Sequence, residues 1–494
     1  MKKYLYILAA VLLASSCTDR VHDAVQVNEL PAIYPDYVGV TIPADIAPMD
    51  YDIIDGKGVL DASVECVDVT VKGSKGGEIH STGDFMDLDI DEWHALTQQN
   101  KGGKLTFTTC VKRDGKWTQY KPFTMSVSTT PLDEWGLTYR RVAPGYEVYS
   151  HMGLYQRDLS TFDEYEVIDN NRVPGACVNC HTSNRTNPKE FLFHVRGDNG
   201  ATAIQKDGVM EMLNTKTDST LGLCVYPYWH PDGRYVVFST NTTRQEYHVV
   251  SDKRIEVFDH KSDLQVYDTE KHQLILSPLV KDTMYNESFP AFSADGKTIY
   301  FCRTVLREYP RDTEIVRYNL CSIAFDAAKG TYGDSIQTLI NAEADSMSIS
   351  IPKPSYDGRY IMYTLAKYGT FPIWHREADL WLLDLRTGDR HPLKDANSPD
   401  TESYHNWSTN SHWFVFSSRR DDGLYTRLYI SSVDDKGNAT KPFMVPQRNP
   451  RHFYDRLMYS YNVPDFTSVK VDVDSRAIAH DIVSPKRTGI SVRK

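Results

Sequence analysis

The chain has 494 residues, 40% of them hydrophobic, with 66 acidic and 55 basic side chains and a net charge of −11. This composition is that of a folded protein with a polar surface, long enough for two domains. The negative charge argues against binding to nucleic acid and against attachment to anionic lipid through a basic patch. The 31 tyrosines, and the lack of a long amphipathic helical pattern, favour an all-β fold.

The N-terminus has the features of an export signal. Lys2 and Lys3 are basic, residues 4–13 form an apolar run too short to span a bilayer, and small residues then lead to Cys17. Residues 1–17 resemble a bacterial lipoprotein signal, in which Cys17 is lipidated after cleavage; an ordinary secretory signal is the alternative. We therefore expect a lipid-anchored protein of the cell envelope, facing the periplasm or the cell surface. Thr18 does not decide between inner and outer membrane, and we favour the outer.

A tether and a first domain should follow the signal. Residues 18–32 are polar and show no periodicity, which is typical of a tether. Residues 33–131 alternate short strands with turn residues such as Lys75-Gly76-Gly77, at intervals of roughly ten residues, as in a β-sandwich. This domain shows no catalytic constellation. A role as a spacer is the simplest interpretation, and carbohydrate or partner binding is the alternative.

The next segment, residues 132–222, contains Cys177-Val178-Asn179-Cys180-His181. C-x-x-C-H is the attachment sequence for c-type haem, in which both thiols add to porphyrin vinyl groups and the histidine ligates the iron. A disulfide, half a zinc site and a thioredoxin-like pair are the alternatives. Zinc would require a second cysteine pair or a spaced histidine pair, and the flanking residues are typical of loops, not of a strand entering a helix. The sequence therefore predicts a covalent haem c in a loop, bound by Cys177 and Cys180 with His181 on the iron.

The sixth ligand of such an iron would set its chemistry. His194 is the first candidate because it is near in sequence, on a predicted strand that leaves the motif; a hydrogen-bonded histidine on a blade face is the alternative. Met152 and then His151 follow, on the strand segment that enters the motif. We expect His230 and His405 to make hydrogen bonds between blades instead.

Residues 223–452 contain an internal repeat, which decides the fold class. Its pattern is an aromatic residue, a tight turn and an apolar strand, and each copy is followed by a second pair of strands. The four copies are Tyr228–Ser239, Ala291–Phe301, Lys353–Thr364 and a decayed copy at Asn406–Ser417. Four strands per repeat, in series, make a β-propeller. We expect roughly six blades, with seven as the alternative, and the segment 453–494 to close the ring or pack beneath it.

The repeat resembles the TolB-type propeller, with its aromatic residue, Ser, a variable residue, Asp-Gly and an apolar strand. The chain as a whole is similar to bacterial lipoproteins with TolB-like propellers, a group often labelled cytochrome c biosynthesis or TolB-like proteins. The segments that carry this resemblance are Tyr139-Arg140-Arg141, Pro144-Gly145-Tyr146-Glu147, Cys177–His181, Phe193-His194-Val195-Arg196-Gly197 and Ser417–Gly423. The resemblance implies an exported lipoprotein with a propeller and does not supply a mechanism.

Five cysteines remain outside the lipid and haem sites. Cys302 and Cys321 should lie on neighbouring strands, where a disulfide could form, and Cys66 could pair with Cys110. Cys224 would then be a buried thiol. The pair Arg419-Arg420, with the two aspartates that follow it, is most simply interpreted as solvated charge.

Two functions follow from the sequence. The first is a membrane-anchored periplasmic monohaem c-type cytochrome-like protein, whose propeller docks a redox partner for electron transfer. The second is a non-redox envelope lipoprotein that binds a protein, glycan or peptide, with a structural haem or none. A hydrolase is not expected, because the chain contains no G-x-S-x-G motif and no catalytic carboxylate pair can be identified.

Overall fold

The computed structural model describes residues 21–143, 151–249, 253–307 and 315–493. The predicted signal, Cys17 and the segment Pro144–Glu147 lie outside these ranges. The described chain forms two compact units. The first holds the residues up to Leu132 together with Leu159–Phe162 and Phe443–Leu457, and the second holds the remainder. No helix in the described ranges combines the length and the apolar character needed to cross a membrane.

The first unit is built mainly of strands, in line with the expected all-β class. Its main sheet has seven strands, and β2 pairs with β4 in a second, small sheet. Helix α2 (Ile90–Gln99), which the turn pattern did not predict, begins at Asp89, whose carboxylate accepts hydrogen bonds from the backbone of Asp91 and Glu92. The other elements are β1 (Val25–Gln26), β2 (Ile33–Tyr34), β3 (Thr41–Ile42), β4 (Asp52–Ile53), β5 (Cys66–Gly73), β6 (Glu78–Gly83), β7 (Lys104–Arg113), β8 (Lys116–Gln119), β9 (Phe123–Val127), β32 (Phe443–Met444) and α3 (Pro450–Arg456).

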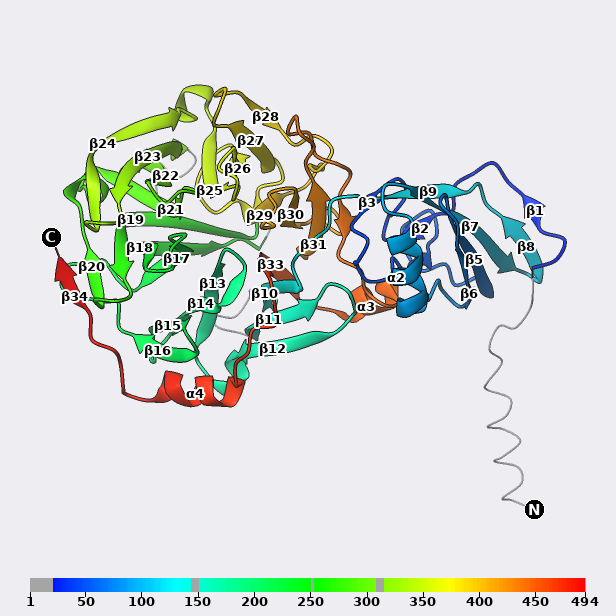
Figure 1. The fold of residues 1–494 in the computed structure, drawn as a ribbon, viewed down its shortest axis with the longest axis horizontal. Coiled ribbons are helices and arrows are strands. Elements are labelled where there is room, and N and C mark those ends of the chain that lie inside the picture. Colours follow the sequence, from blue (N-terminus) through cyan, green and yellow to red (C-terminus); the bar gives the residue numbers. More distant parts are fainter. Residues whose placement is uncertain (1–20, 144–150, 250–252, 308–314, 494) are drawn as a thin grey trace, which may run out of the picture. The chain divides into compact units, whose positions relative to one another are not determined.

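The second unit is a six-bladed β-propeller, in which six antiparallel sheets surround a common centre (Figure 1). Residues 132–222 supply the strands β10 (Gly136–Val142), β11 (Met152–Asp158), β12 (Glu164–Asp169), β13 (Cys177–Asn184), β14 (Asn187–Arg196), β15 (Ala201–Lys206) and β16 (Val209–Leu213). The third and fourth blades are β17 (Cys224–Trp229), β18 (Tyr235–Tyr247), β19 (Ile255–Asp268), β20 (Gln273–Ile275), β21 (Tyr285–Phe292), β22 (Thr298–Val305), β23 (Asn319–Asp326) and β24 (Thr331–Ile340). The fifth and sixth blades contain β25 (Ser348–Pro354), β26 (Tyr360–Ala366), β27 (Asp379–Asp384), β28 (Arg390–Pro392), β29 (Glu402–Trp407), β30 (Trp413–Ser418) and β31 (Arg427–Ser432).

The C-terminal segment closes the ring. Strand β33 (Ser460–Thr467) pairs with β10 and becomes the innermost strand of the first blade, whose other strands come from residues 136–169. The six inner strands β33, β13, β17, β21, β25 and β29 then contact one another in cyclic order. Beyond β33 the chain forms helix α4 (Ser475–Val483) and β34 (Ser491–Arg493), and β34 adds in parallel to the outer edge of the third blade. The first blade thereby gains an inner strand like the other five, and the ring is closed.

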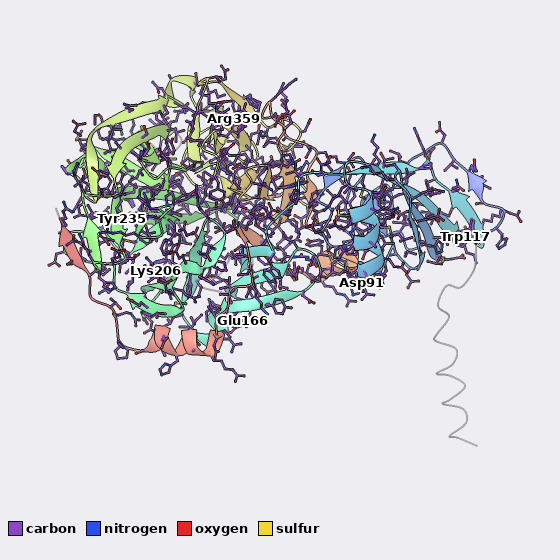
Figure 2. The ribbon with its side chains drawn as sticks, viewed as in Figure 1. Asp91, Trp117, Glu166, Lys206, Tyr235 and Arg359 are labelled. Carbon is purple, nitrogen blue, oxygen red and sulfur yellow. The ribbon has the colours of Figure 1, made fainter. Side chains whose placement is uncertain are left out.

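In the third and fifth blades the turn motif of the repeat, which joins the first strand to the second, is connected to the third strand by an ion pair. Gly233 and Gly358 have φ values of +73° and +74°, which glycine adopts without strain. The arginine that follows each glycine pairs with an aspartate at the end of the third strand, Arg234 with Asp268 at 2.7 Å and Arg359 with Asp384 at 3.2 Å. Each of these arginines also lies over the ring of the next tyrosine; Tyr235 and Arg359 are labelled in Figure 2.

The expected pairing of Cys302 with Cys321 is wrong. The register of β22 and β23 places Leu320 opposite Cys302, and Phe301 opposite Cys321. Directly paired residues share a face of a sheet, so the two cysteines point to opposite faces. Both are buried free thiols, as are Cys110 and Cys224, and the pair of Cys66 with Cys110 is therefore not formed.

Two glycines at the same place in the repeat allow a test of the contact between the third and fourth blades. An added Cβ at Gly296 would lie 2.0 Å from Nε2 of His230, which donates to the Gly296 carbonyl at 3.1 Å. At Gly358 the nearest atom would be Cβ of Ala294, at 3.4 Å. Both glycines have a φ of +74°, so alanine at either site should cost roughly 1–2 kcal/mol from backbone strain. We expect Gly296→Ala to cost about 2 kcal/mol more, because it displaces the buried His230.

Urea denaturation of both variants and the parent measures this difference. Gly358→Ala is the control for the backbone conformation. Equal losses of unfolding free energy in the two variants would show that His230 does not join the blades in this way.

Candidate functional site

Each inner strand is interrupted by one residue in the left-handed region of backbone space. In five of the six strands the ladder to the second strand shifts its register within a residue or two of it, and β33 shows the same kind of shift opposite Thr138 and Arg140. These residues, with φ between +48° and +54°, are Cys180, Tyr226, Phe289, Ile351, Tyr404 and Val463. A bulge of this kind turns consecutive side chains and backbone groups away from the regular alternation of a strand. All six residues line the same central cavity.

The cavity has a volume of about 1040 Å³. Small-molecule sites in proteins usually measure roughly 300–1,000 Å³, so this one has room for a large ligand. The residue after each bulge also lines it, and these residues are His181, Pro227, Pro290, Pro352, His405 and Pro464. At the mouth are the side chains of Tyr247, Val249, Leu424 and Met458, and Val249 is 96% exposed.

The predicted haem motif lies on the wall of this cavity. Residues 170–176 form a 3₁₀ turn and a loop, and residues 185–186 a hairpin turn, as the sequence indicated. The motif itself does not lie in a loop, because Cys177–Asn184 is strand β13, the inner strand of the second blade. Both thiols are free, and both Cys177 and Cys180 line the cavity because the bulge at Cys180 interrupts the alternation of the strand.

Arg140 fixes the surroundings of the first thiol. Its guanidinium donates to the Val178 carbonyl at 3.2 Å, to Sγ of Cys177 at 3.5 Å and to Sδ of Met152 at 3.1 Å. The amide of Asn179 also donates to Cys177, at 3.4 Å. Burial raises the pKa of the Cys180 thiol, so that sulfur is protonated at neutral pH. One thiol is thus held by donors, and the other is a neutral group on the wall.

His181 is 4% exposed and packs near Phe191, with ring centroids 6.2 Å apart. Burial lowers its pKa to about 4, so the imidazole is neutral, the form that ligates metals. The backbone of Thr138 on the first blade approaches the ring and raises this pKa somewhat, yet neither ring nitrogen meets hydrogen-bond geometry with any group in the described ranges. A buried imidazole with two unsatisfied nitrogens is uncommon in proteins, and a ligand in the cavity would satisfy one of them.

The other histidines have assigned partners. His405, at the corresponding position of β29, donates from Nε2 to the Met362 carbonyl of the fifth blade at 3.0 Å. His230 donates to the Gly296 carbonyl of the fourth blade. The prediction that these two histidines join blades is confirmed. His181 differs from His405 in having no such bond.

The candidate sixth ligands fall at different distances from the cavity. Met152, the first residue of β11, contributes to the cavity wall. His194 lies on β14, where it is paired with Asn179 and 1% exposed, and its side chain is not part of the wall. His151 also lies off the wall, with Nε2 2.9 Å from Asp169. Met152 is therefore the candidate that the structure brings to the same cavity as His181.

Asp465 on β33 is an acidic group in the cavity wall, and it joins three blades. It accepts hydrogen bonds from the Ser183 amide at 3.0 Å and from Asn406 at 2.6 Å. Burial raises its pKa to about 6, and the Lys353 ammonium counteracts part of this rise. Lys353 is itself buried in the wall over the Tyr228 ring, and burial lowers its pKa. No pattern in the sequence indicated either residue, since they meet only when the ring has closed.

At its other end the channel is filled. A cavity of about 20 Å³ lies further along the inner strands, and Thr182 and Asn406 line both cavities. Arg185 donates across this end to the carbonyls of Ala294 and Tyr356. The described residues therefore close this end, and the cavity opens at the end lined by Tyr247 and Met458.

The mouth is flanked by a long hairpin. Strands β18 and β19 extend beyond their blade, and the hairpin contacts the fifth blade through Glu256, which accepts a hydrogen bond from the Tyr368 hydroxyl at 2.6 Å. Glu246, His248 and Glu256 have potential metal-ligand atoms within 4.8 Å of one another. His248 already pairs with Glu256 at 2.9 Å, and Lys253 bonds to Tyr368, so this cluster is balanced without a metal.

The lining of the cavity is positively charged although the protein is acidic. Among the described residues of the wall one is acidic, Asp465, and five are cationic: Arg140, Arg196, Arg254, Lys353 and Arg419. The interpretation of Arg419-Arg420 as solvated charge is wrong, because Arg419 is 3% exposed and Arg420 pairs with buried Glu402 at 2.9 Å. Their place at the end of β30, beside the loop of the fifth blade, cannot be seen in the sequence alone.

Comparison with known proteins assigns the chain to no family. No family model matches it, and no curated protein sequence matches it significantly. Prolyl oligopeptidase B from Galerina marginata is 12% identical, covering 62% of this chain and 44% of its own, with a TM-score of 0.35. An oligogalacturonate lyase in complex with manganese is 11% identical; the match covers 61% of this chain and 72% of the lyase, with a TM-score of 0.34. A puromycin-hydrolyzing peptidase of Mycobacterium tuberculosis is 12% identical; the match covers 83% of this chain and 57% of the peptidase, with a TM-score of 0.35.

This chain therefore spans less than half the length of the Galerina enzyme. The similarities extend no further than the fold. They say nothing about activity or ligand.

The buried carboxyl of Asp465 should make stability depend on pH. Its pKa is raised to about 6 from an ordinary 3.8, so between these values the folded protein holds a proton that the unfolded chain has lost. Raising the pH through this interval therefore favours unfolding. Relative to Asp465→Asn, the parent should lose roughly 3 kcal/mol of unfolding free energy from about pH 4 to pH 6.5, with no further change above pH 7. Urea denaturation of both proteins at half-unit steps checks this, and parallel curves would contradict it.

Proposed function

We propose that the central cavity holds one haem, joined to Cys177 and Cys180 by thioether bonds, and that the protein is a c-type cytochrome-like electron carrier of the cell envelope. The observation that carries the proposal is that both thiols and His181 line one cavity large enough for such a group. The unsatisfied nitrogens of His181 support it as the iron ligand. When bound, a haem would supply one-electron redox chemistry.

The chain's own residues would hold and orient the group. Cys177 and Cys180 would fix one porphyrin edge against β13, and His181 would stand below the ring. Met152 would be the candidate for the second protein ligand of the iron, because it lies on the same wall while His194 does not. Met152 would have to give up the hydrogen bond that its Sδ accepts from Arg140 in order to ligate the iron. Arg140 would remain beside the sulfur of Cys177. The cationic lining would favour the carboxylates that the group carries.

The location is part of the same proposal. The resemblance of residues 1–17 to a lipoprotein signal supports lipidation at Cys17, and we propose the outer membrane as the site, with the protein facing the periplasm or the cell surface. Haem c is attached in exported compartments, so the two features agree. The partner would be a redox or structural protein of the envelope, docking near the mouth of the cavity.

A second function, from a different class, shares the cavity. Aromatic side chains at the wall, including Tyr226, Tyr404 and Trp374, together with the cations, also suit a glycan or a peptide. In this case the protein would be a non-redox interaction protein, with a structural haem or none. A matured protein that shows no covalent haem would favour this second function.

The spectrum of the protein tests the proposal. Produced in a host that matures c-type cytochromes, the parent should give a pyridine haemochrome spectrum of covalently bound haem, with one haem per chain. Cys177→Ala and Cys180→Ala should each weaken the covalent retention of haem through acid–acetone extraction, because one thioether bond is lost. His181→Ala should shift the Soret band, because the axial ligand is removed.

Cys224→Ala is the matched control. Cys224 is a buried free thiol on β17, also an inner strand, but it does not line the cavity, so its removal should leave haem content and spectrum unchanged. A colourless parent, or a Cys180→Ala protein with an unaltered spectrum, would end the haem proposal. A redox titration of the coloured protein then separates an electron carrier, which titrates at physiological potentials, from a protein with a structural haem.

A further inference from the structure

Arg419 is a buried guanidinium in the cavity wall that is held only by neutral groups. Its Nε and Nη1 atoms each donate to a backbone carbonyl at 2.6 Å, those of Ile373 and Leu424. The guanidinium carbon lies 3.1 Å from the centre of the Trp374 ring. The side chain is thus fixed in place, yet none of these partners neutralises its charge.

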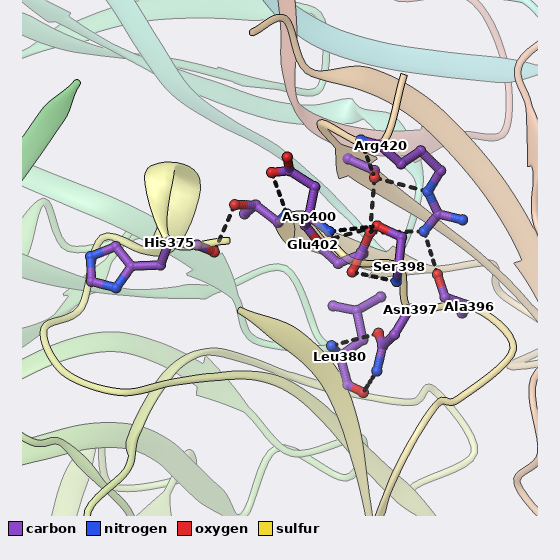
Figure 3. Close-up of polar contacts among 10 residues, drawn as sticks. His375, Leu380, Ala396, Asn397, Ser398, Asp400, Glu402 and Arg420 are labelled. Atoms are coloured by element: carbon purple, nitrogen blue, oxygen red, sulfur yellow. Dashed lines mark hydrogen bonds and ion pairs between the residues drawn. The ribbon is translucent and has the colours of Figure 1, made fainter. Parts of the chain in front are cut away.

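The neighbouring Arg420, in contrast, is neutralised by a carboxylate. Arg420 donates to Glu402 at 2.9 Å, and Glu402 is completely buried. Ser398 and Ser418 also donate to this carboxylate, at 2.6 and 2.9 Å (Figure 3). Arg420 is therefore part of a closed structural network, and Arg419 has no corresponding carboxylate within ion-pair distance in the described ranges.

The charge of Arg419 is not compensated by the rest of the cavity. The pKa of Arg419 falls to about 9, chiefly because of burial, with Asp400 and Asp422 opposing and Arg254 adding to the fall. The side chain is still charged at neutral pH. The acid of the wall, Asp465, already accepts bonds from Ser183 and Asn406. A buried cation that forms no ion pair within the described ranges, and is opposed only at longer range by Asp400 and Asp422, is costly to maintain for structure alone. Such a cation suits a site whose anion arrives with a ligand.

We infer that Arg419, together with Arg254, forms a subsite for the carboxylate of an organic acid in the central cavity. An arginine presents a planar fork that matches a carboxylate, and Nη2 of Arg419 makes no hydrogen bond to the carbonyls that hold Nε and Nη1. The wall beside it is apolar and aromatic, with Phe371, Trp374 and Tyr425. The ligand is therefore an acid with a flat or apolar body, not a bare inorganic anion.

Two sources could supply this carboxylate, a free acid that enters through the mouth or a propionate of the proposed haem. The subsite rests on the cavity and on Arg419, and it does not depend on the haem. A colourless protein would overturn the haem proposal and leave this inference to be tested in the same way.

Benzoate and its neutral analogue benzamide are suitable probes, measured by calorimetric titration of the matured protein and of a Cys177→Ser/Cys180→Ser variant that lacks covalent haem. We expect benzoate to bind about tenfold more tightly than benzamide, because the charged hydrogen bond is lost in the amide. Arg419→Gln should remove this preference, and Arg419→Lys should retain part of it. Arg376→Gln is the control, since Arg376 is exposed, pairs with Asp400 at 3.6 Å and does not line the cavity.

The two forms of the protein distinguish the sources. Preference for benzoate in the matured protein identifies a site for a free acid. Preference only in the haem-free variant, with a lowered reduction potential in the matured Arg419→Gln protein, identifies a propionate site. Equal binding of benzoate and benzamide by both forms would overturn the inference. So would an Arg419→Gln protein, folded by circular dichroism, that keeps the full preference. If this variant does not fold, Arg254→Gln replaces it and should weaken the preference.

Discussion

One left-handed residue in each inner strand is the constraint on which the rest of the propeller depends. In a regular strand successive side chains point to the two faces of the blade, toward the neighbouring blades. The bulges at Cys180, Tyr404 and their four counterparts interrupt this alternation, and all six residues line the central cavity. Four of the six bulges are followed by proline, which has no N–H to leave unpaired in the interrupted ladder. The cavity is thus a property of the backbone, and the side chains determine only what it can bind.

Much of the fold could be predicted because the residues of the repeat determine a turn and the strands on either side of it. Asp-Gly allows the tight turn, the aromatic residue ahead of it packs between sheets, and the apolar residues after it form the second strand. Residues 132–222 lack this signal, yet they form the second blade and three of the four strands of the first. The prolines could have revealed the bulges, since Pro227, Pro290 and Pro352 each stand six residues before a turn glycine. Helix α2 was not predicted, although Trp93, Leu96 and Thr97 recur at helical spacing on its buried side.

The candidate site could be predicted in part, because one part of it is a local sequence pattern, as the turn of the repeat is. C-x-x-C-H is a local pattern, so Cys177, Cys180 and His181 were identifiable from five letters. Their position on an inner strand was not, because their flanks have the composition of loops. The charges around them come from separate blades: Arg140 from the first, Lys353 from the fifth and Arg419 from the sixth. No spacing in the sequence relates these residues, and an arginine in a polar run looks solvated until the blade that covers it is known.

The closure of the ring by β33 has a consequence for the order of synthesis. Ser183 and Thr182 on β13 meet their partner Asp465 only when the last tenth of the polypeptide has been made, because β33 begins at Ser460. Until β33 is in place the ring is open beside β13, and the thiols of Cys177 and Cys180 are accessible from that side as well as through the mouth of the cavity.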